Sequence, residues 1–319
     1  NNTNNTNNTN NTNNTNNIDP VPSQPKCSDT PAPERCTADP DTFEWGTASV
    51  ITSFVIAGDD ECCFKFPYDA IGDPFDNGLG GALSLAGQLD SINDTIAESI
   101  ASGSLVLVLE HAGLDNLQAG EFSINFFLAK YDGITEIDAA GNNTVKIDPA
   151  SIDDGTYPAA ILPGATLAGN KIAAGPGNIF LEIDLLGTTL RLNIREALIA
   201  ATPVPARSDL ETGVALTNGK IGGIIMLEEI YDAVNNFAST CECMGSPAKI
   251  LDDCEGNKIN TCTAGSSCAT IADNCGAVSF VGIFADIDTT GKNPTQGDAF
   301  SIGATFEASG AVITGIDAE

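Results

Sequence analysis

The first seventeen residues constrain this chain most, because NNTNNTNNTNNTNNTNN repeats every three residues and holds no apolar side chain before Ile18. Such a stretch cannot bury surface, so it cannot contribute to a globular core. Every triplet places an Asn two residues before a Thr, which is the acceptor pattern for an N-linked glycan. We therefore predict a glycosylated tail rather than a bare low-complexity linker. The predicted acceptors of the tail are Asn1, Asn4, Asn7, Asn10 and Asn13.

The period of the tail also has a geometric consequence. A polyproline II chain has three residues per turn, so the acceptors would form one edge with a sugar roughly every 9 Å. Glycans at that density are expected to stiffen the backbone. Two further acceptors lie outside the tail. Asn142 stands in a polar turn, and Asn93 stands in a predicted helix, where only the exposed face is usable.

Composition excludes several classes of partner. The chain has 319 residues, 42% of them hydrophobic, which suffices for one large β domain or two ordinary ones. Its 13 basic and 43 acidic residues give a net charge of −30. This charge repels nucleic acid and anionic lipid surfaces. No apolar run approaches the roughly 20 residues of a membrane span. Neither a signal peptide nor an initiator Met precedes Asn1, so we expect a processed, secreted product without membrane insertion.

The cysteines indicate an oxidising compartment. They form an even set of ten in a polar, acidic chain, which predicts disulfides. A zinc site would need paired Cys-x-x-Cys knuckles or nearby histidines, and neither is present. Four cysteines before residue 64 and six after residue 240 suggest two local frameworks, with the connectivity left open. They are Cys27, Cys36, Cys62, Cys63, Cys241, Cys243, Cys254, Cys262, Cys268 and Cys275.

Changes in composition divide the chain into three parts. Residues 1–17 form the repeat tail, and residues 18–44 form a spacer with six prolines, which is stiff and extended. Residues 45–319 form a β-rich body that contains a cysteine-rich insert at 241–275. Cys27 and Cys36 are expected to staple the spacer either to itself or to the body.

The body reads as a mainly β fold, a sandwich or jelly roll with two short helices. The predicted strands are separated by Gly, Pro, Asn and Asp at intervals of around ten residues. Apolar residues at helical spacing predict helices at 88–103 and 226–238. The Gly-rich stretch 73–87 reads as a loop, and Asn218-Gly219 as a turn. The predicted strands are 45–57, 64–68, 104–112, 121–133, 143–151, 159–169, 178–187, 188–202, 216–226, 277–288, 299–308 and 311–316.

One acidic segment has the character of a cation site. Asp286, Asp288 and Asp298 surround Gly291 in a loosened version of the calcium loop, in which short acidic side chains converge on a hard cation. The segment lacks the acidic residue at the fifth position and the Glu at the twelfth. An ordinary acidic hairpin loop is the alternative reading.

Catalytic signals are weak, and we predict no enzyme. His111 is the sole histidine, and no Gly-x-Ser-x-Gly motif accompanies it, which favours a structural histidine. Adjacent acid pairs such as Asp153-Asp154 are typical of solvated turns in so acidic a chain. A secreted hydrolase is therefore the weakest of the three functional classes considered.

The tail, the proline spacer and the acidic disulfide-linked body together resemble the protomers of secreted glycan-coated fibrils and pilus-like extracellular filaments. The resemblance is specific for Asn1 to Thr15 and generic for the body. The body, with its Cys241-x-Cys243 insert and its terminal DAFSIGATFEA, is also similar to uncharacterised secreted bacterial proteins. The first resemblance implies homopolymerisation, in which an extended segment of one subunit completes or follows the sheet of the next. The spacer is too rich in proline to be an obvious donor strand, which leaves a body strand, the C-terminal AVITGI or the tail sugars.

These observations give two hypotheses of different class. The first is a structural subunit of an extracellular glycosylated filament. The second is a calcium-dependent surface adhesin or carbohydrate-binding module on a glycosylated stalk. Neither requires a cofactor other than the calcium of the second.

The tail generates a direct test. Its first basic residue is Lys26, so trypsin releases residues 1–26 as one peptide. Mass spectrometry of this peptide is expected to show sugar on the five acceptors. Thr3→Ala should remove the sugar of Asn1 alone, whereas Thr3→Ser keeps the acceptor pattern and should retain it. Bare asparagines in the peptide from the native source would contradict the interpretation.

Overall fold

The computed structural model describes residues 25–59, 61–66, 75–85, 87–133, 137–138, 141–185, 188–244, 261–264, 266, 268–269, 272, 281–290 and 297–317. The side chains of residues 181–191, 237, 281 and 283 are not described. The sequon tail, Cys254 and Cys275 lie outside the described residues, so the predictions for them stay predictions.

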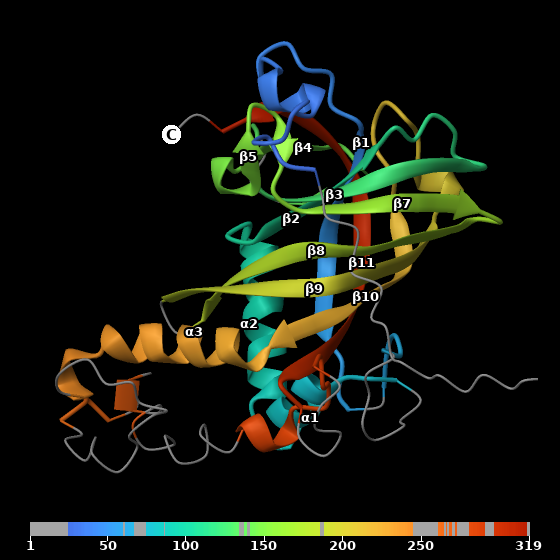
Figure 1. Ribbon diagram of the computed structural model, residues 1–319. Helices are drawn as coiled ribbons and strands as arrows, with labels where there is room; N and C mark the ends of the chain where they lie inside the picture. Colours follow the sequence, from blue (N-terminus) through green and yellow to red (C-terminus); the bar gives the residue numbers. More distant parts are fainter. Residues whose placement is uncertain are drawn as a thin grey trace, which may run out of the picture.

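The body is built around an eight-stranded closed antiparallel barrel (Figure 1). The ring runs β1-β2-β3-β7-β8-β9-β10-β11 and closes where β11 pairs with β1 along Ala48–Ile56. The mainly β prediction is confirmed, but the predicted sandwich is wrong. The strands of the ring are β1 (Thr47–Ile56), β2 (Val106–Ala112), β3 (Gly120–Tyr131), β7 (Ile161–Ala168), β8 (Lys171–Leu185), β9 (Thr188–Pro203), β10 (Leu216–Met226) and β11 (Ala299–Ile316).

The fold differs from a sandwich because two pairings, of β3 with β7 and of β1 with β11, join what would otherwise be two separate sheets. β3 pairs with β7 along Gly120–Asn125, and β11 is a single strand of 18 residues rather than the two strands predicted. Ser309 and Gly310, which separate the two predicted strands in the sequence, continue the ladder by pairing with Val50 and Ser49. A strand of this length reaches past β1 to a further neighbour.

That neighbour is β4 (Asn143–Ile147), which closes a second, smaller ring. β4 pairs parallel with the end of β11 and antiparallel with the end of β3. The strands β1, β2, β3, β4 and β11 therefore also return on themselves. The two rings share the wall formed by β1, β2, β3 and β11.

Alternate residues of the shared wall enter different cores. On β2, Leu107 and Leu109 belong to the large core, while Val106 and Val108 belong to the small one, and all four are buried. A strand buried on both faces has no polar face to show. This explains why the sequence from Ser104 to Ala112 is a nearly unbroken apolar run.

Over the residues described, three α-helices accompany the sheet, and two of them confirm the predicted segments. They are α2 (Leu89–Ser102), which ends at Gly103 with a φ of 74°, and α3 (Leu227–Ser239). The third, α1 (Gly78–Leu85), lies in the stretch predicted as a loop. No helix in the described part of the chain is long and apolar enough to cross a membrane.

The buried Asn77 and the small size of Gly80 explain α1. The Asn77 Oδ1 accepts from the backbone N of Gly80 at 3.3 Å and of Gly303 at 3.0 Å, and its Nδ2 donates to the Ala57 carbonyl at 2.6 Å. A Cβ at Gly80 would lie 2.0 Å from that carbonyl. The glycines that suggested a loop are therefore what lets this helix lie against the barrel.

Other local predictions need correction. Asn218-Gly219 is not a hairpin turn but part of β10, where Asn218 has a φ of 52° and the register with β9 and β11 shifts. This geometry is a bulge within the strand. Phe64–Phe66 is not a strand, and Val281–Phe284 forms a 3₁₀ turn where a strand was predicted.

Asn93 of α2 replaces a missing strand beside β1. The pairing of β1 with β2 covers only Thr47–Val50, and α2 packs against the remainder. The Asn93 side chain accepts from Ile56 N at 2.9 Å and donates to Ile56 O at 3.0 Å. The amide thus satisfies both backbone groups of one residue, as a neighbouring strand would.

This arrangement separates a structural role of Asn93 from its role as a glycan acceptor. Asn93→Ala should lower the free energy of unfolding by roughly 1–3 kcal/mol, because two partly buried backbone groups lose their partner. Thr95→Ala destroys the same sequon but keeps the amide, and the Thr95 hydroxyl donates to the exposed Ser91 carbonyl of its own helix. It should change stability little. Denaturant titration measures both, and equal losses in the two variants would sink the structural role.

Candidate functional site

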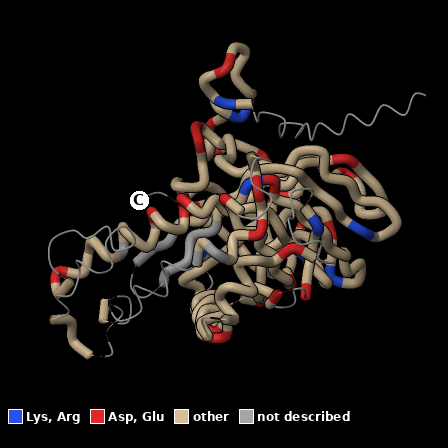
Figure 2. Tube along the Cα trace, turned by 60° about the horizontal axis from the view of Figure 1, so that its bottom comes forward, with Lys and Arg blue, Asp and Glu red and all other residues tan. Residues whose placement is uncertain are grey.

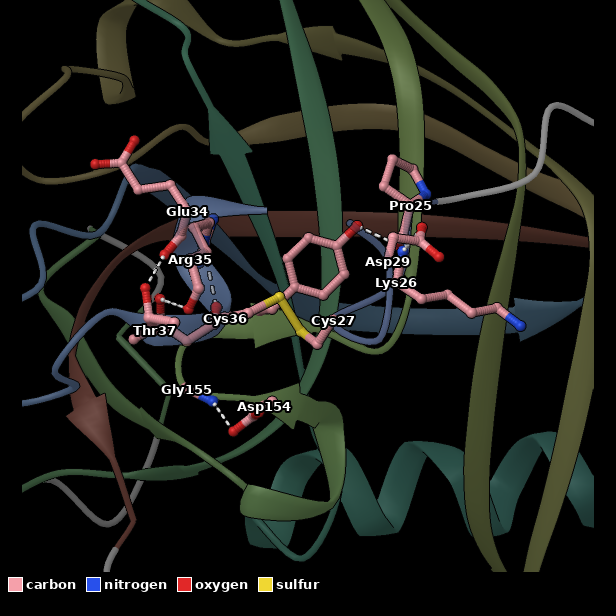
Figure 3. Close-up of a disulfide and its surroundings, with 12 residues drawn as sticks. Pro25, Lys26, Cys27, Asp29, Glu34, Arg35, Cys36, Thr37, Asp154 and Gly155 are labelled. Atoms are coloured by element: carbon pink, nitrogen blue, oxygen red, sulfur yellow. Dashed lines mark hydrogen bonds between the residues drawn. A yellow bond between two sulfur atoms is a disulfide. The ribbon is translucent and has the colours of Figure 1, made fainter. Parts of the chain in front are cut away.

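The site that the tail brings to attention is the place where the N-terminal segment joins the barrel (Figure 3). The Tyr157 hydroxyl donates to the Pro25 carbonyl at 2.6 Å, at the first described residue of the chain. Two residues later Cys27 forms a disulfide with Cys36, with the Cα atoms 5.5 Å apart. The sequence left open whether these cysteines link the spacer to itself or to the body, and the structure shows that they link the spacer to itself.

The stapled loop packs on a small hairpin of β5 (Ile152–Asp154) and β6 (Tyr157–Pro158). The Arg35 carbonyl accepts from the Thr156 N at 2.9 Å and from its hydroxyl at 3.2 Å. Gly155 makes this approach possible, because its φ is +55° and a Cβ there would lie 2.6 Å from the Cys36 carbonyl oxygen. A side chain at this position would push the spacer off the hairpin.

We call this attachment of the spacer to the barrel the anchor. Arg35 connects the anchor to the shared wall of the two rings. Its Nη1 donates to the Glu110 Oε2 at 3.0 Å, and its Nε donates to the Thr156 carbonyl at 3.1 Å. Glu110 lies on β2, is 1% exposed, and also accepts from Asn125 Nδ2 at 2.7 Å and Gly46 N at 2.8 Å. A carboxylate buried so deeply needs such partners, so removing any one of them is costly.

Aromatic rings complete the anchor. The Arg35 guanidinium carbon lies 4.6 Å from the ring centroid of Phe43 and 5.2 Å from that of Trp45. Trp45 meets Phe127 edge to face with centroids 5.9 Å apart, and Phe127 belongs to the small core. The segment from Pro25 to Trp45 therefore closes one end of the small ring, and Pro25, the first described residue, is held at a fixed place on the barrel.

The C-terminal end lies at the same end of the molecule as this anchor (Figure 1). The Asp317 N donates to the Ile147 carbonyl of β4 at 2.8 Å, and Lys130 pairs with the Asp317 carboxylate at 2.7 Å. The described start of the cysteine-rich insert, residues 241–244, follows α3 and lies away from this end (Figure 1).

The eight cysteines that the structure describes fall into local pairs. Besides Cys27–Cys36, the bonded pairs are the adjacent Cys62–Cys63, Cys241–Cys268 and Cys243–Cys262. Cys241 packs with Ala238 and Met244 in a small separate cluster at the end of α3. Local pairing before residue 64 and after residue 240 agrees with two separate frameworks.

The two described acceptor asparagines have different surroundings. Asn142 is exposed in the turn before β4, and its Nδ2 donates to Asp138 at 2.8 Å. Asn93 is half-buried and bonded to β1 as described above. Asn142 thus offers the freer site for a glycan, and glycosylation of both stays a prediction.

The acids predicted to bind calcium each serve a local hydrogen bond. Asp286 accepts from the N and hydroxyl of Ser301, and Asp288 accepts from the N and hydroxyl of Thr290. Asp298 does the same for Thr289, at 2.8 and 2.7 Å. Among the described residues no group of three His, Cys, Asp or Glu is placed to hold a metal ion. These three carboxylates fasten turns around the start of β11.

His111 lies inside the large ring, as a structural histidine would. It is 0% exposed, its Nε2 lies 2.8 Å from the Ser49 hydroxyl, and that hydroxyl donates to the Val214 carbonyl at 2.6 Å. The second ring nitrogen, Nδ1, is buried with no hydrogen-bond partner in the described part of the chain. Burial lowers the pKa of His111 to about 4.

Sequence reasoning missed both the Arg35–Glu110 anchor and a shallow pocket on β8 and β9. The signal for the first was present, because an acid in the middle of an apolar strand requires a buried partner. The pocket has a volume of about 410 Å³ and combines residues of three elements and a loop, so no sequence pattern marks it. Its lining comprises Ala159, Asn178, Ile179, Phe180, Asn193, Ile194, Arg195 and Glu229.

No protein-family model, curated protein sequence or solved structure matches this chain significantly.

The burial of His111 predicts a pH dependence of stability. The pKa of an unfolded histidine is about 6.5, above the folded value of about 4. The unfolded chain therefore takes up the proton first, and stability should fall as the pH drops from about 6.5 towards 4. The loss amounts to at most about 3 kcal/mol. His111→Gln cannot titrate and should lack this component of the slope. Denaturant titrations between pH 7 and pH 4 that give parallel curves for the two proteins would refute it.

Proposed function

We propose that this protein is a structural subunit of an extracellular, glycosylated filament, in which the N-terminal tail links one subunit to the next. The observation that carries the proposal is the anchor of the spacer. A disulfide, the bond from Tyr157 to Pro25 and the buried Arg35–Glu110 pair hold the base of the tail at a fixed place on the barrel.

A tail with a fixed base can set the orientation of the next subunit, whereas a tail with a mobile base could only keep the two subunits connected. A flexible linker explores many directions, whereas a stiff segment on a rigid base has one. With sugars at every third residue, the repeat would continue the direction that the anchor sets. The neighbour would then meet the tail in a defined orientation, as a regular helical assembly requires.

The sheet argues for the tail over the C-terminal strand as the linking segment. The stretch Ala311–Ile316 belongs to β11 and pairs with β4, and Ala311 pairs with β1 as well. Donating it to a neighbour would open the small ring and expose its core, although residues 304–310 would still pair with β1 and keep the large ring closed. All strands of the two rings lie between Thr47 and Ile316, so a link through the tail leaves both rings intact.

The proposal is tested by electron microscopy and sedimentation of the purified, glycosylated protein. The native protein should form long regular filaments that persist in EDTA. Replacing the tail threonines Thr3, Thr6, Thr9, Thr12 and Thr15 by Ala should leave subunits that sediment alone, because the tail loses its sugars. The matched set of Thr→Ser replacements keeps the acceptor pattern and should assemble.

Two outcomes would count against the filament. A native protein with sugar on its tail that still sediments as a monomer would remove it. Assembly or ligand binding that disappears in EDTA would instead favour the calcium-dependent adhesin.

A further inference from the structure

The pocket on β8 and β9, which we call the Asn193 pocket, contains polar groups for which the described part of the chain supplies no hydrogen-bond partner. The side-chain amides of Asn178 and Asn193 are exposed and make no hydrogen bond within the described residues. Glu229 of α3 accepts from Arg195 Nη2 at 2.6 Å through one oxygen. Its other oxygen, Oε2, is buried and has no donor in the described part of the chain.

These groups define the chemistry of a ligand. The Glu229 Oε2 requires a donor, the amide N–H groups require acceptors, and the amide oxygens accept in turn. A hydroxyl both donates and accepts, so a ligand with several neighbouring hydroxyls satisfies all of them. The charges of Arg195 and Glu229 cancel at the pocket, which favours a neutral ligand over a phosphate or a carboxylate. A neutral sugar has these properties.

One lining residue of the pocket lies close in sequence to the residue that holds Pro25. Ala159 lines it and follows Tyr157 by two residues, and the Tyr157 hydroxyl holds the Pro25 carbonyl. Twenty-four residues that carry five sugar acceptors precede Pro25. In an extended conformation they span about 75 Å, so sugars of this tail or of a neighbour's tail reach the pocket.

Residues 155–195, which include β6, β7, β8 and the first part of β9, differ in net charge from the rest of the chain. Residues 155–195 contain the acids Glu182 and Asp184 and the bases Lys171, Arg191 and Arg195, for a net charge of +1. The whole chain has a net charge of −30, so the remaining residues carry −31. Figure 2 shows the acidic positions scattered along the described chain, with few basic ones among them. Another part of so acidic an assembly would meet the least electrostatic repulsion at this nearly neutral stretch.

We propose that the Asn193 pocket binds a neutral sugar of the N-glycans on the Asn-Asn-Thr tail. The proposal rests on the proposed function, since it requires a glycosylated tail, and it names the surface that the tail of the filament contacts. Asn178 and Asn193 would bond to ring hydroxyls, and Glu229 would accept from a hydroxyl while Arg195 holds it in place.

The test uses the full-length protein with the five tail threonines replaced by Ala as receptor, so that its own tail carries no sugar. The probe is the glycosylated tryptic peptide 1–26 from the native protein, titrated by calorimetry. We expect saturable binding, weakened at least tenfold by Asn193→Ala and by Glu229→Gln. The control Asn236→Ala alters an exposed position of α3 outside the pocket and should bind like the parent.

Each other result overturns the pocket. Absence of binding, equal binding by Asn193→Ala, or equal binding of a synthetic bare peptide 1–26 would each do so. Filaments that form while the glycopeptide fails to bind would remove the pocket and leave the filament standing, whereas a bare native tail would remove both. A dilution series separates the two sources of the sugar. If the native monomer does not bind added glycopeptide, its pocket is already occupied by its own tail. If it does bind the glycopeptide, its pocket is free for the tail of a neighbouring subunit.

Discussion

The double use of one wall is the constraint on which the rest of the structure depends. β11 pairs with β1 and β10 in the large ring and continues to β4 in the small one, so the same hydrogen-bond ladder closes both. Breaking the contact of β11 with β1 would open both cores at once. The wall must therefore be apolar on both faces, and the few polar groups inside it, such as Glu110 and His111, occur only where a partner or a neutral state makes burial tolerable.

Glu110 converts this constraint into an attachment for the N-terminal segment. Within the described chain its carboxylate has donors from Arg35, Asn125 and Gly46, so β2, β3 and the spacer meet at a single buried charge. Such a pair adds little net stability compared with an apolar replacement, but it makes the position of the spacer specific, because the wrong docking leaves the charge unpaired. The disulfide Cys27–Cys36 limits the spacer loop in the unfolded chain and narrows the ways in which it can dock. Specific docking is what a structural role of the tail demands.

The sequence predicted local elements well and their closure poorly. α2 and α3 were marked by apolar residues at helical spacing, and β1, β2 and β3 by β-branched or alternating patterns, because these signals depend on neighbours along the chain. The pairings of β3 with β7 and of β1 with β11 depend on residues far apart, and a closed ring and a sandwich share the same alternation. α1 was missed because Gly78 and Gly80 signal a loop locally, while tertiary contacts with Asn77 and Ala57 favour the helix. The Arg35–Glu110 anchor was inferable in half, from an acid within an apolar strand, but its partner 75 residues away was not.

Electrostatics connects the barrel to the tail. Subunits with a net charge of −30 repel one another at distances up to the screening length, about 8 Å at physiological salt. An assembly of such subunits would be favoured by contacts that are uncharged or that hold the acidic bodies apart, and the proposed Asn/Thr tail with neutral sugars would provide both. The nearly neutral stretch 155–195 would give those sugars a place to bind away from most of the acidic residues. The anchor fixes the base of the tail, and the pocket is a different surface of the barrel, so the proposed binding of one subunit's tail in the next subunit's pocket would be a head-to-tail contact, the kind that an open filament requires.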